Sequence, residues 1–208
     1  LTDTGPYAPE GAAIGRRALR NASLGYLAAA DAADGAARAR AQFDAGRNMT
    51  DVLAALGVLS RLDTPARAEA FARFYDRWHA DPLVLDKWFA LQAVSPLPDT
   101  IARVRALMRH PDFDLRNPNR VRALIGSFCA NQVHFHAASG EGYALLTDTI
   151  LALDPLNGQV AARMVTPLGQ WRRQDAARQG LMRAALERLL AVPTLSANAR
   201  EMVSRSLG

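Results

Sequence analysis

Apolar residues recur at helical spacing along this chain of 208 residues, and prolines, glycines and short polar segments interrupt them at close intervals. Met49, Val52, Leu53 and Leu56 follow the spacing i, i+3, i+4, i+7, which places them on one face of a helix, and Asn48 precedes them in position to cap it. The other segments with this pattern are 71–78, 83–92, 101–109, 118–129, 142–153, 159–168, 173–191 and 196–206. We therefore expect about ten helices joined by short connections.

The short connections determine how such helices pack. They favour antiparallel neighbours, and serial helical hairpins of this length stack more readily into an α-solenoid than into a four-helix bundle. The expected fold class is therefore all-α, an α-solenoid of the HEAT or armadillo kind that is built from antiparallel hairpins. No strict sequence repeat is visible, so the likeness to those repeats concerns architecture alone.

Residues 1–15 differ from the rest of the chain in composition. They begin at Leu1 instead of a methionine, and they contain Pro6, Pro9 and three glycines. We expect an irregular N-terminal segment here, of the kind with which an excised fragment begins. A single helical domain is expected over residues 16–208, because no linker or change of composition follows.

Composition narrows the class of protein further. Half of the residues are apolar, and the chain is long enough to bury a continuous core without disulfides or a structural metal. No stretch approaches the roughly 20 consecutive apolar residues of a membrane span, and the N-terminus has no basic-then-apolar signal pattern. Cys129 is the only cysteine, so no internal disulfide can form. These features favour a cytoplasmic protein without a membrane partner.

The formal net charge is +5, and the second half of the chain carries all of the excess. Residues 99–208 contain fourteen basic and nine acidic side chains, whereas residues 1–98 contain eleven of each. This asymmetry leaves open an independent α-solenoid that binds a protein or a nucleic acid through its basic half. The arginines of segment 172–188 are diluted by Asp175 and Glu187, however, so a solvated helix face is the better interpretation. We expect no nucleic-acid partner.

The motifs of the common hydrolases and nucleotide-binding proteins are absent. None of the four histidines is followed by glutamate, as the zinc motif His-Glu-x-x-His requires. His134 and His136 flank Phe135, and local hydrogen bonds of a loop explain this pair better than a metal site does. Cys129 lies at the edge of an apolar stripe, where burial as a small hydrophobic residue is expected. The chain alone has no recognisable active site, and we expect the isolated fragment to be inactive.

Two arginines at the start of one predicted helix are candidate binding residues. Asn117 should cap this helix and Pro118 should be its first residue. In a regular helix Arg120 and Arg122 lie on either side of the apolar stripe, so both guanidinium groups should flank the core contact. Free N–H groups and flanking arginines together favour an anion such as a carboxylate. An ordinary solvated arginine pair remains the alternative.

Arg163 is the third candidate. Pro167 follows it by four residues, so the carbonyl of Arg163 loses its usual helical partner and the helix should bend there. Such a bend can direct a side chain into a cavity. It can equally be an accommodation of packing.

Several strings of the sequence agree together with one family. The segments NPNRVRALIGSF, NMTDVLAAL and FYDRWHADPLVLDKWFALQA resemble consecutive blocks of the C-terminal helical domain of bacterial aminopeptidase N, a zinc metallo-aminopeptidase of the gluzincin family. The blocks occur in the order of the family and extend from about residue 15 to the end of the chain. This resemblance implies a larger enzyme that removes N-terminal residues from peptides.

The resemblance also implies a role for the domain. The catalytic zinc lies outside this fragment, no metal or other cofactor belongs to this chain, and none of its residues corresponds to the catalytic ones. The helical array closes over the catalytic domain of the same polypeptide and walls a cavity that admits short peptides. Arg120, Arg122 and Arg163 line the route of the C-terminal part of the peptide substrate. Self-association of the isolated fragment is an expected result of exposing its interface.

Overall fold

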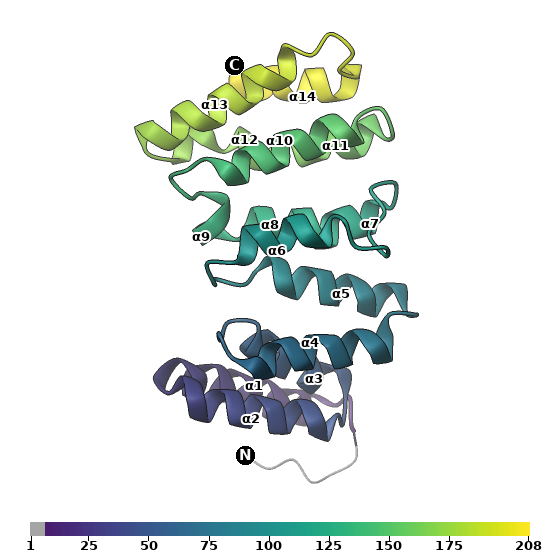
Figure 1. Ribbon diagram of the computed structural model, residues 1–208, viewed down its shortest axis with the longest axis vertical. Coiled ribbons are helices and arrows are strands. Elements are labelled where there is room, and N and C mark those ends of the chain that lie inside the picture. The colour runs from purple at the N-terminus through teal and green to yellow at the C-terminus, as the bar shows by residue number, and fades with distance from the viewer. Residues whose placement is uncertain (1–6) are drawn as a thin grey trace. The chain divides into compact units, whose positions relative to one another are not determined.

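The computed structural model describes residues 7–208, which form helices, turns and connecting loops without a β-strand. The chain comprises two compact units, the first ending at Leu91 and the second extending from Gln92 to Gly208. The first unit contains α1 (Gly11–Ala30), α2 (Ala32–Ala45), α3 (Met49–Leu59), α4 (Pro65–Trp78) and most of α5 (Pro82–Ala93), as Figure 1 shows. No helix among residues 7–208 is long and apolar enough to cross a membrane.

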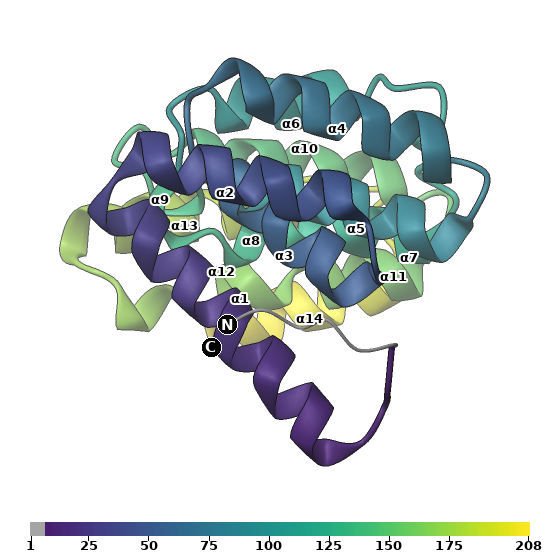
Figure 2. The same cartoon turned by 90° about the horizontal axis from the view of Figure 1, so that it is seen from below.

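Local chemistry sets the ends of α1, α2 and α3. Asp31 separates α1 from α2, and its side chain accepts hydrogen bonds from the N–H groups of Ala33 and Asp34 at 2.9 and 3.0 Å. The two helices diverge from this turn, as seen in Figure 2. Gly46 ends α2 in the left-handed conformation, at φ 52°, which glycine adopts without strain. The side chain of Asn48 then caps α3, as predicted.

The core of the first unit lies between α3, α4 and α5. Leu56, Leu59, Phe74 and Phe89 are almost wholly buried there. The indole N–H of Trp88 donates a hydrogen bond of 2.9 Å to the carbonyl of Phe71, so the polar atom of this large side chain is satisfied inside the core. Apolar burial and this hydrogen bond together hold α4 against α5.

The second unit consists of shorter elements. They are α6 (Thr100–Leu107), α7 (Pro118–Val121), the π-helical turn η1 (Arg122–Gly126), α8 (Ser127–Ala130), α9 (Gln132–Phe135), α10 (Glu141–Leu153), α11 (Gly158–Met164), α12 (Thr166–Gly169), the 3-10 turn η2 (Trp171–Arg173), α13 (Ala176–Leu190) and α14 (Ala197–Leu207).

The core of the second unit is built around α10, which packs against both α11 and α13. Phe128, Phe135 and Tyr143 meet edge to face, with ring centroids 6.2 and 5.3 Å apart for the two consecutive pairs. Asp154, at the end of α10, accepts hydrogen bonds from the backbone N–H and the hydroxyl of Ser196. Ser196 in turn caps α14, so this contact ties the last helix to the centre of the unit.

The predicted all-α class is confirmed, with three local differences. The helix α1 begins at Gly11, so the irregular segment expected over residues 1–15 ends earlier, and its first six residues lie outside the described part. The predicted helix 118–129 is not regular but contains η1 in its middle. The segment 159–168 divides into α11 and α12. A single domain over residues 16–208 stays a prediction, since one helical array can contain two compact units.

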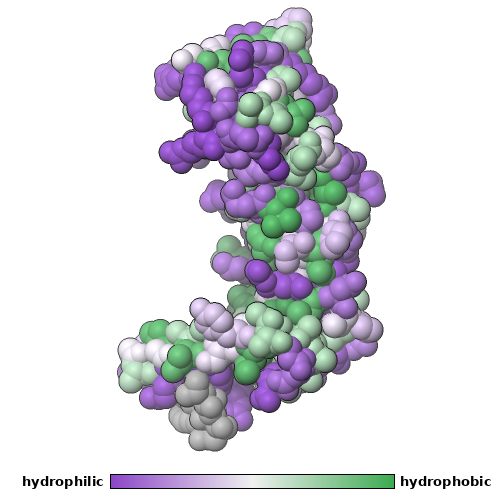
Figure 3. Space-filling model, turned by 90° about the vertical axis from the view of Figure 1, so that its left-hand side faces the viewer, coloured by the Kyte–Doolittle hydropathy of each residue, from purple (hydrophilic) through white to green (hydrophobic). Residues whose placement is uncertain are grey.

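Large apolar residues reach the surface on α1. Ile14, Leu19 and Tyr26 are exposed, Tyr26 to 80%. Hydrophobic residues of the first unit appear among hydrophilic ones at the bottom of Figure 3. The buried face of α1 holds Ala13, Arg17, Leu24 and Ala28, so large apolar residues do not mark that face in the sequence.

Candidate functional site

The predicted start of α7 is present at Asn117. Its side-chain oxygen accepts hydrogen bonds from the N–H groups of Asn119 and Arg120 at 3.0 and 3.3 Å, and Pro118 occupies the first helical position. Two of the N–H groups that were expected to face an anion are therefore already satisfied. The anion-binding capacity of this helix start is lower than the sequence suggests.

Arg120 differs from the expectation that it flanks the core. Only 5% of this residue is exposed, and its guanidinium Nη1 donates a hydrogen bond of 2.6 Å to the carbonyl of Asp112. The side chain therefore holds the loop before α7 in place, and its aliphatic part is buried. A helical wheel places Arg120 beside the core instead of in it, because the wheel does not represent the loop that folds back over this turn.

Arg122 lies on the surface, at the first position of the π-helical turn η1. The N–H of Ser127 bonds to the carbonyl of Arg122, five residues back, which widens the helix here. A Cβ atom placed on Gly126 would lie 3.4 Å from the Cγ atom of Arg122, so the arginine stem runs across this glycine. Nη2 donates a hydrogen bond of 3.2 Å to the Asn119 side chain. The glycine and the widened turn together direct the guanidinium along the helix surface.

Arg163 also lies on the surface, at the end of α11. Instead of the predicted bend, the helix divides at Val165: the N–H of Val165 bonds to the carbonyl of Ala162 at 3.2 Å, and Pro167 lies in the first turn of α12. Proline removes a backbone donor and cannot continue the ladder. Arg163 is thereby left in the last turn of α11 instead of inside a continuous helix.

A shallow hollow of about 320 Å³ lies in front of Arg163, between α11 and α14. Gln159, Asn198, Glu201 and Arg205 supply its polar groups. Arg205 forms an ion pair with Glu201 at 2.6 Å, whereas the Arg163 guanidinium has no hydrogen bond or ion pair within residues 7–208. The only carboxylate that lines the hollow, that of Glu201, is therefore already paired. The Arg163 guanidinium has hydrogen-bond donors available, and such donors suit an anion.

The three predicted arginines do not form one cluster. Arg120 is an internal brace, Arg122 belongs to η1, and Arg163 faces the hollow on α11. No hydrogen bond joins them in the described part of the chain. Only Arg122 and Arg163 have guanidinium groups accessible to a dissolved anion, so these two remain the candidate binding residues.

The histidine pair lies at the end of the short helix α9 and not in the expected loop, and Cys129 is buried as predicted. His136 Nδ1 lies 2.8 Å from the Tyr143 hydroxyl, and its carbonyl accepts a hydrogen bond of 2.6 Å from Arg178 Nε. Burial raises the pKa of the Cys129 thiol to about 12, so its reactive thiolate is not populated at neutral pH. No cluster of three or more metal-binding side chains occurs among residues 7–208.

Most arginines near α13 lie on the surface, as predicted, and several of them also make local contacts. Arg172 donates to the carbonyls of Ser206 and Leu207 at 3.3 and 3.0 Å, and its guanidinium stacks on Trp171. Arg188 pairs with Asp148 of α10 at 2.7 Å. These contacts consume donors that a phosphate backbone would otherwise use.

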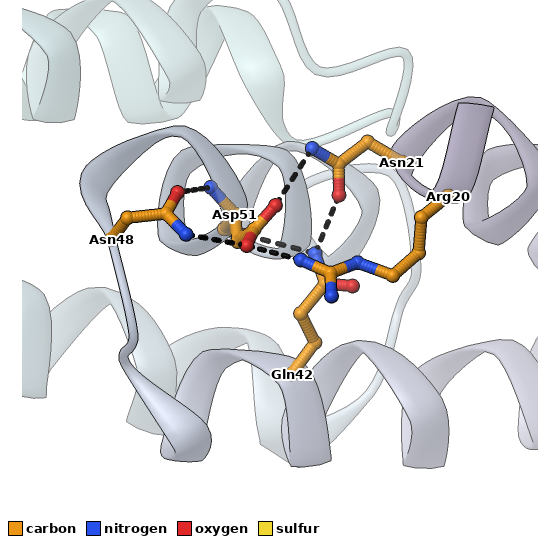
Figure 4. A network of polar contacts seen from close by, with 5 residues as sticks. All are labelled: Arg20, Asn21, Gln42, Asn48 and Asp51. Carbon is orange, nitrogen blue, oxygen red and sulfur yellow. Dashed lines mark hydrogen bonds and ion pairs between the residues drawn. The ribbon is translucent and has the colours of Figure 1, made fainter. Parts of the chain in front are cut away.

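One polar network of the first unit is invisible in the sequence pattern. Asp51 of α3 accepts from Arg20 and from Asn21 of α1, while Gln42 of α2 donates to the carbonyl of Asp51 at 2.9 Å (Figure 4). Asn48 donates to the same carboxylate at 2.7 Å. Its members lie up to 31 residues apart, so no short-range spacing reveals it. The network joins α1, α2 and α3, and we interpret it as a structural feature that holds these helices together.

Comparisons with known proteins bear on the chain as a whole. Aminopeptidase N of Caulobacter vibrioides is 47% identical over 205 residues, which are 98% of this chain and 24% of that protein. Aminopeptidase N of Escherichia coli is 41% identical over 202 residues, 97% of this chain and 23% of that protein. The crystal structure of Legionella pneumophila aminopeptidase A in complex with aspartic acid matches with a TM-score of 0.91 and 34% identity, covering 98% of this chain and 25% of that one.

These matches confirm the resemblance to aminopeptidase N. The chain spans about a quarter of the length of these relatives. A family model described as a domain of unknown function (DUF3458_C) with ARM repeats matches residues 1–208, which confirms the armadillo-like architecture. The chain therefore belongs to the DUF3458_C family of ARM-repeat domains.

Proposed function

We propose that this chain is the C-terminal helical domain of a zinc-dependent, cytoplasmic aminopeptidase that removes N-terminal residues from peptides. The observation that carries the proposal is the identity of 41 to 47% to aminopeptidase N over almost the whole chain, together with the small share of those proteins that it spans. The helical array packs against the catalytic domain of the same polypeptide, which holds the zinc. It walls the cavity in which peptides are cleaved and limits the size of what enters.

Arg122 and Arg163 attract the carboxylate end of the peptide. Both guanidinium groups are on the surface, and the hollow before Arg163 offers amide and guanidinium donors with its one carboxylate already paired. A positive potential of this kind raises the local concentration of an anionic substrate and orients it. Arg120 has no part in this role, because its guanidinium is bound to the carbonyl of Asp112.

The test compares one tetrapeptide as free acid and as C-terminal amide in the intact enzyme. With Arg163→Ala or Arg122→Ala, kcat/KM for the free acid should fall about tenfold, the value of one charge-assisted contact, while kcat/KM for the amide should hardly change. Arg188→Ala, which removes a surface arginine paired with Asp148, is the matched control and should affect neither substrate. An equal loss for acid and amide would exclude carboxylate guidance. The assignment to an aminopeptidase would survive that result.

A further inference from the structure

A second basic hollow is lined by residues of the first unit, whereas the residues of the proposed peptide route belong to the second unit. It has a volume of about 280 Å³ and lies between the α2–α3 connection and α4. Arg47, Arg73 and Arg77 line it together with one carboxylate, that of Asp44. The charges of its lining side chains therefore sum to about +2 at neutral pH. Such an excess in a small hollow favours an anion.

The carboxylate cannot neutralise these arginines, because it is already shared. Asp44 accepts from Arg73 Nη1 at 2.5 Å and from Arg40 Nε at 3.0 Å. Burial raises the pKa of Asp44, but the hydrogen bonds from Arg73 and Arg40 outweigh it and hold the pKa below its usual value. The carboxylate is thus charged at neutral pH and already shared by two arginines. A guanidinium of the hollow that has no hydrogen bond or ion pair of its own can donate to another anion.

Arg77 supplies a guanidinium that can donate to such an anion. Its Cζ atom lies 5.0 Å from the ring centroid of Trp78, and no hydrogen bond or ion pair engages its N–H groups among residues 7–208. A cation–π contact occupies the face of a guanidinium and leaves its N–H edge able to donate in the plane. Nη1 lies 3.6 Å from the position of a Cβ atom on Gly46, so this edge lies over the connection between α2 and α3.

Arg73 also makes a cation–π contact with an aromatic ring. Its Cζ atom lies 5.5 Å from the ring centroid of Phe43, and Nη1 binds Asp44. Two aromatic rings thus fix two guanidinium groups around one hollow. Met49, the first residue of α3, also lines the hollow, but Asn48 already caps this helix by accepting from the N–H of Asp51. The guanidinium forks of Arg73 and Arg77 suit the oxygens of a tetrahedral dianion.

We propose that this hollow binds a small phosphate-type dianion, with Arg73 and Arg77 as its principal donors. The phosphate is either free or the phosphoryl group of a small metabolite, since both present the same oxygens. Binding would draw α4 to the start of α3 and stabilise the first unit.

The test is calorimetric titration of the whole 208-residue chain at constant ionic strength. Inorganic phosphate should bind saturably against a chloride background, and Arg77→Gln should weaken it about tenfold or more. The matched control is Arg61→Gln, an equal charge change at the far end of α3, which should change the affinity less than about twofold. Arg77→Lys keeps the charge but loses the planar fork, and it should fall between the two.

The source of the phosphate is resolved by a second titration with glycerol 3-phosphate. Tighter binding of the ester than of inorganic phosphate assigns the hollow to a phosphorylated metabolite, and the reverse assigns it to free phosphate. Absence of saturable binding for both compounds overturns the proposal. So does an equal loss of affinity in Arg77→Gln and Arg61→Gln, because that outcome means a general charge effect. Circular dichroism of each variant verifies that it is folded.

Discussion

Asp51 on α3 forms an ion pair with Arg20 on α1, and the carboxylate of this pair is almost wholly buried. Asp51 is exposed to only 3%, and its backbone and side chain also accept from Gln42, Asn21 and Asn48. These contacts fix α1 and α2 around the first turn of α3. The stability of the first unit should therefore depend on this one carboxylate more than on any exposed ion pair.

Replacing Asp51 tests this dependence. Asp51→Ala leaves the Arg20 charge and two amide donors without their acceptor, so we expect a loss of about 2–4 kcal/mol in the free energy of unfolding. Asp34→Ala removes one member of the exposed Arg38 pair and should cost less than about 1 kcal/mol. Urea denaturation of both variants measures the difference. Equal effects in the two variants would show that the network is not a stabilising element.

The same carboxylate predicts how stability changes with acid. Burial raises the pKa of Asp51, but hydrogen bonds from Arg20, Asn48 and Asn21 outweigh it and hold the pKa below its usual value. The contribution of Asp51 is therefore present above the unfolded pKa of about 3.9 and is lost as the pH falls through the lower, folded pKa. Melting temperatures between pH 6 and pH 2 should fall less steeply in Asp51→Asn than in the wild type. An identical slope would contradict the assignment.

The close approach of α1 to α2 depends on Gly35. A Cβ atom there would lie 2.3 Å from the Cα atom of Ala28, which forces the helices apart. Gly35→Ala should lower the free energy of unfolding by about 1–3 kcal/mol, as overpacking does. Gly180→Ala on α13 meets nothing within 4 Å and should instead stabilise by about 0.5–1 kcal/mol. Thermal denaturation of the pair provides the measurement, and a neutral Gly35→Ala would refute the close contact.

His136 should titrate below the range of an ordinary histidine. Burial lowers the pKa of His136, and the neighbouring Arg178 guanidinium lowers it further. Because the folded state keeps this ring neutral, its stability contribution is lost as the pH falls from about 6.5 toward the folded pKa. Proton NMR should place the transition below pH 6.5 in the wild type and closer to 6.5 in Arg178→Gln. Arg183→Gln, on the same helix, is the control, and a midpoint at or above 6.5 in the wild type would be contrary to the structure.

Residues with a one-sided apolar pattern were predictable from the sequence, and residues in long-range contacts were not. The spacing of Met49, Val52 and Leu56 gives α3 directly, and Asn117 with Pro118 marks the start of α7. The buried face of α1 is regularly spaced, but it consists of Ala13, Arg17, Leu24 and Ala28, so large apolar residues do not mark it in the sequence. The sequence predicted a bend near Arg163 from Pro167, because the loss of a backbone donor is a local effect, but it did not predict that the helix divides there.

The surface positions of the candidate arginines were predicted in part for the same reason, whereas their role in binding stays a prediction. Arg122 and Arg163 are on the surface, but Arg120 is not, since the loop that ends at Asp112 returns to it. The π-helical turn depends on a backbone hydrogen bond between the N–H of Ser127 and the carbonyl of Arg122, which the spacing of side chains does not predict. The hollow around Arg77 combines three segments of the chain and is likewise a product of tertiary packing.

We propose that this chain belongs to an aminopeptidase whose catalytic centre lies outside it. The most direct measurement compares peptide hydrolysis by the purified 208-residue chain and by the intact polypeptide, each supplied with zinc and each assayed after chelation. We predict zinc-dependent release of N-terminal residues by the intact polypeptide and none above background by the chain alone. Zinc-dependent hydrolysis by the chain alone, or its absence in the intact polypeptide, would contradict this account.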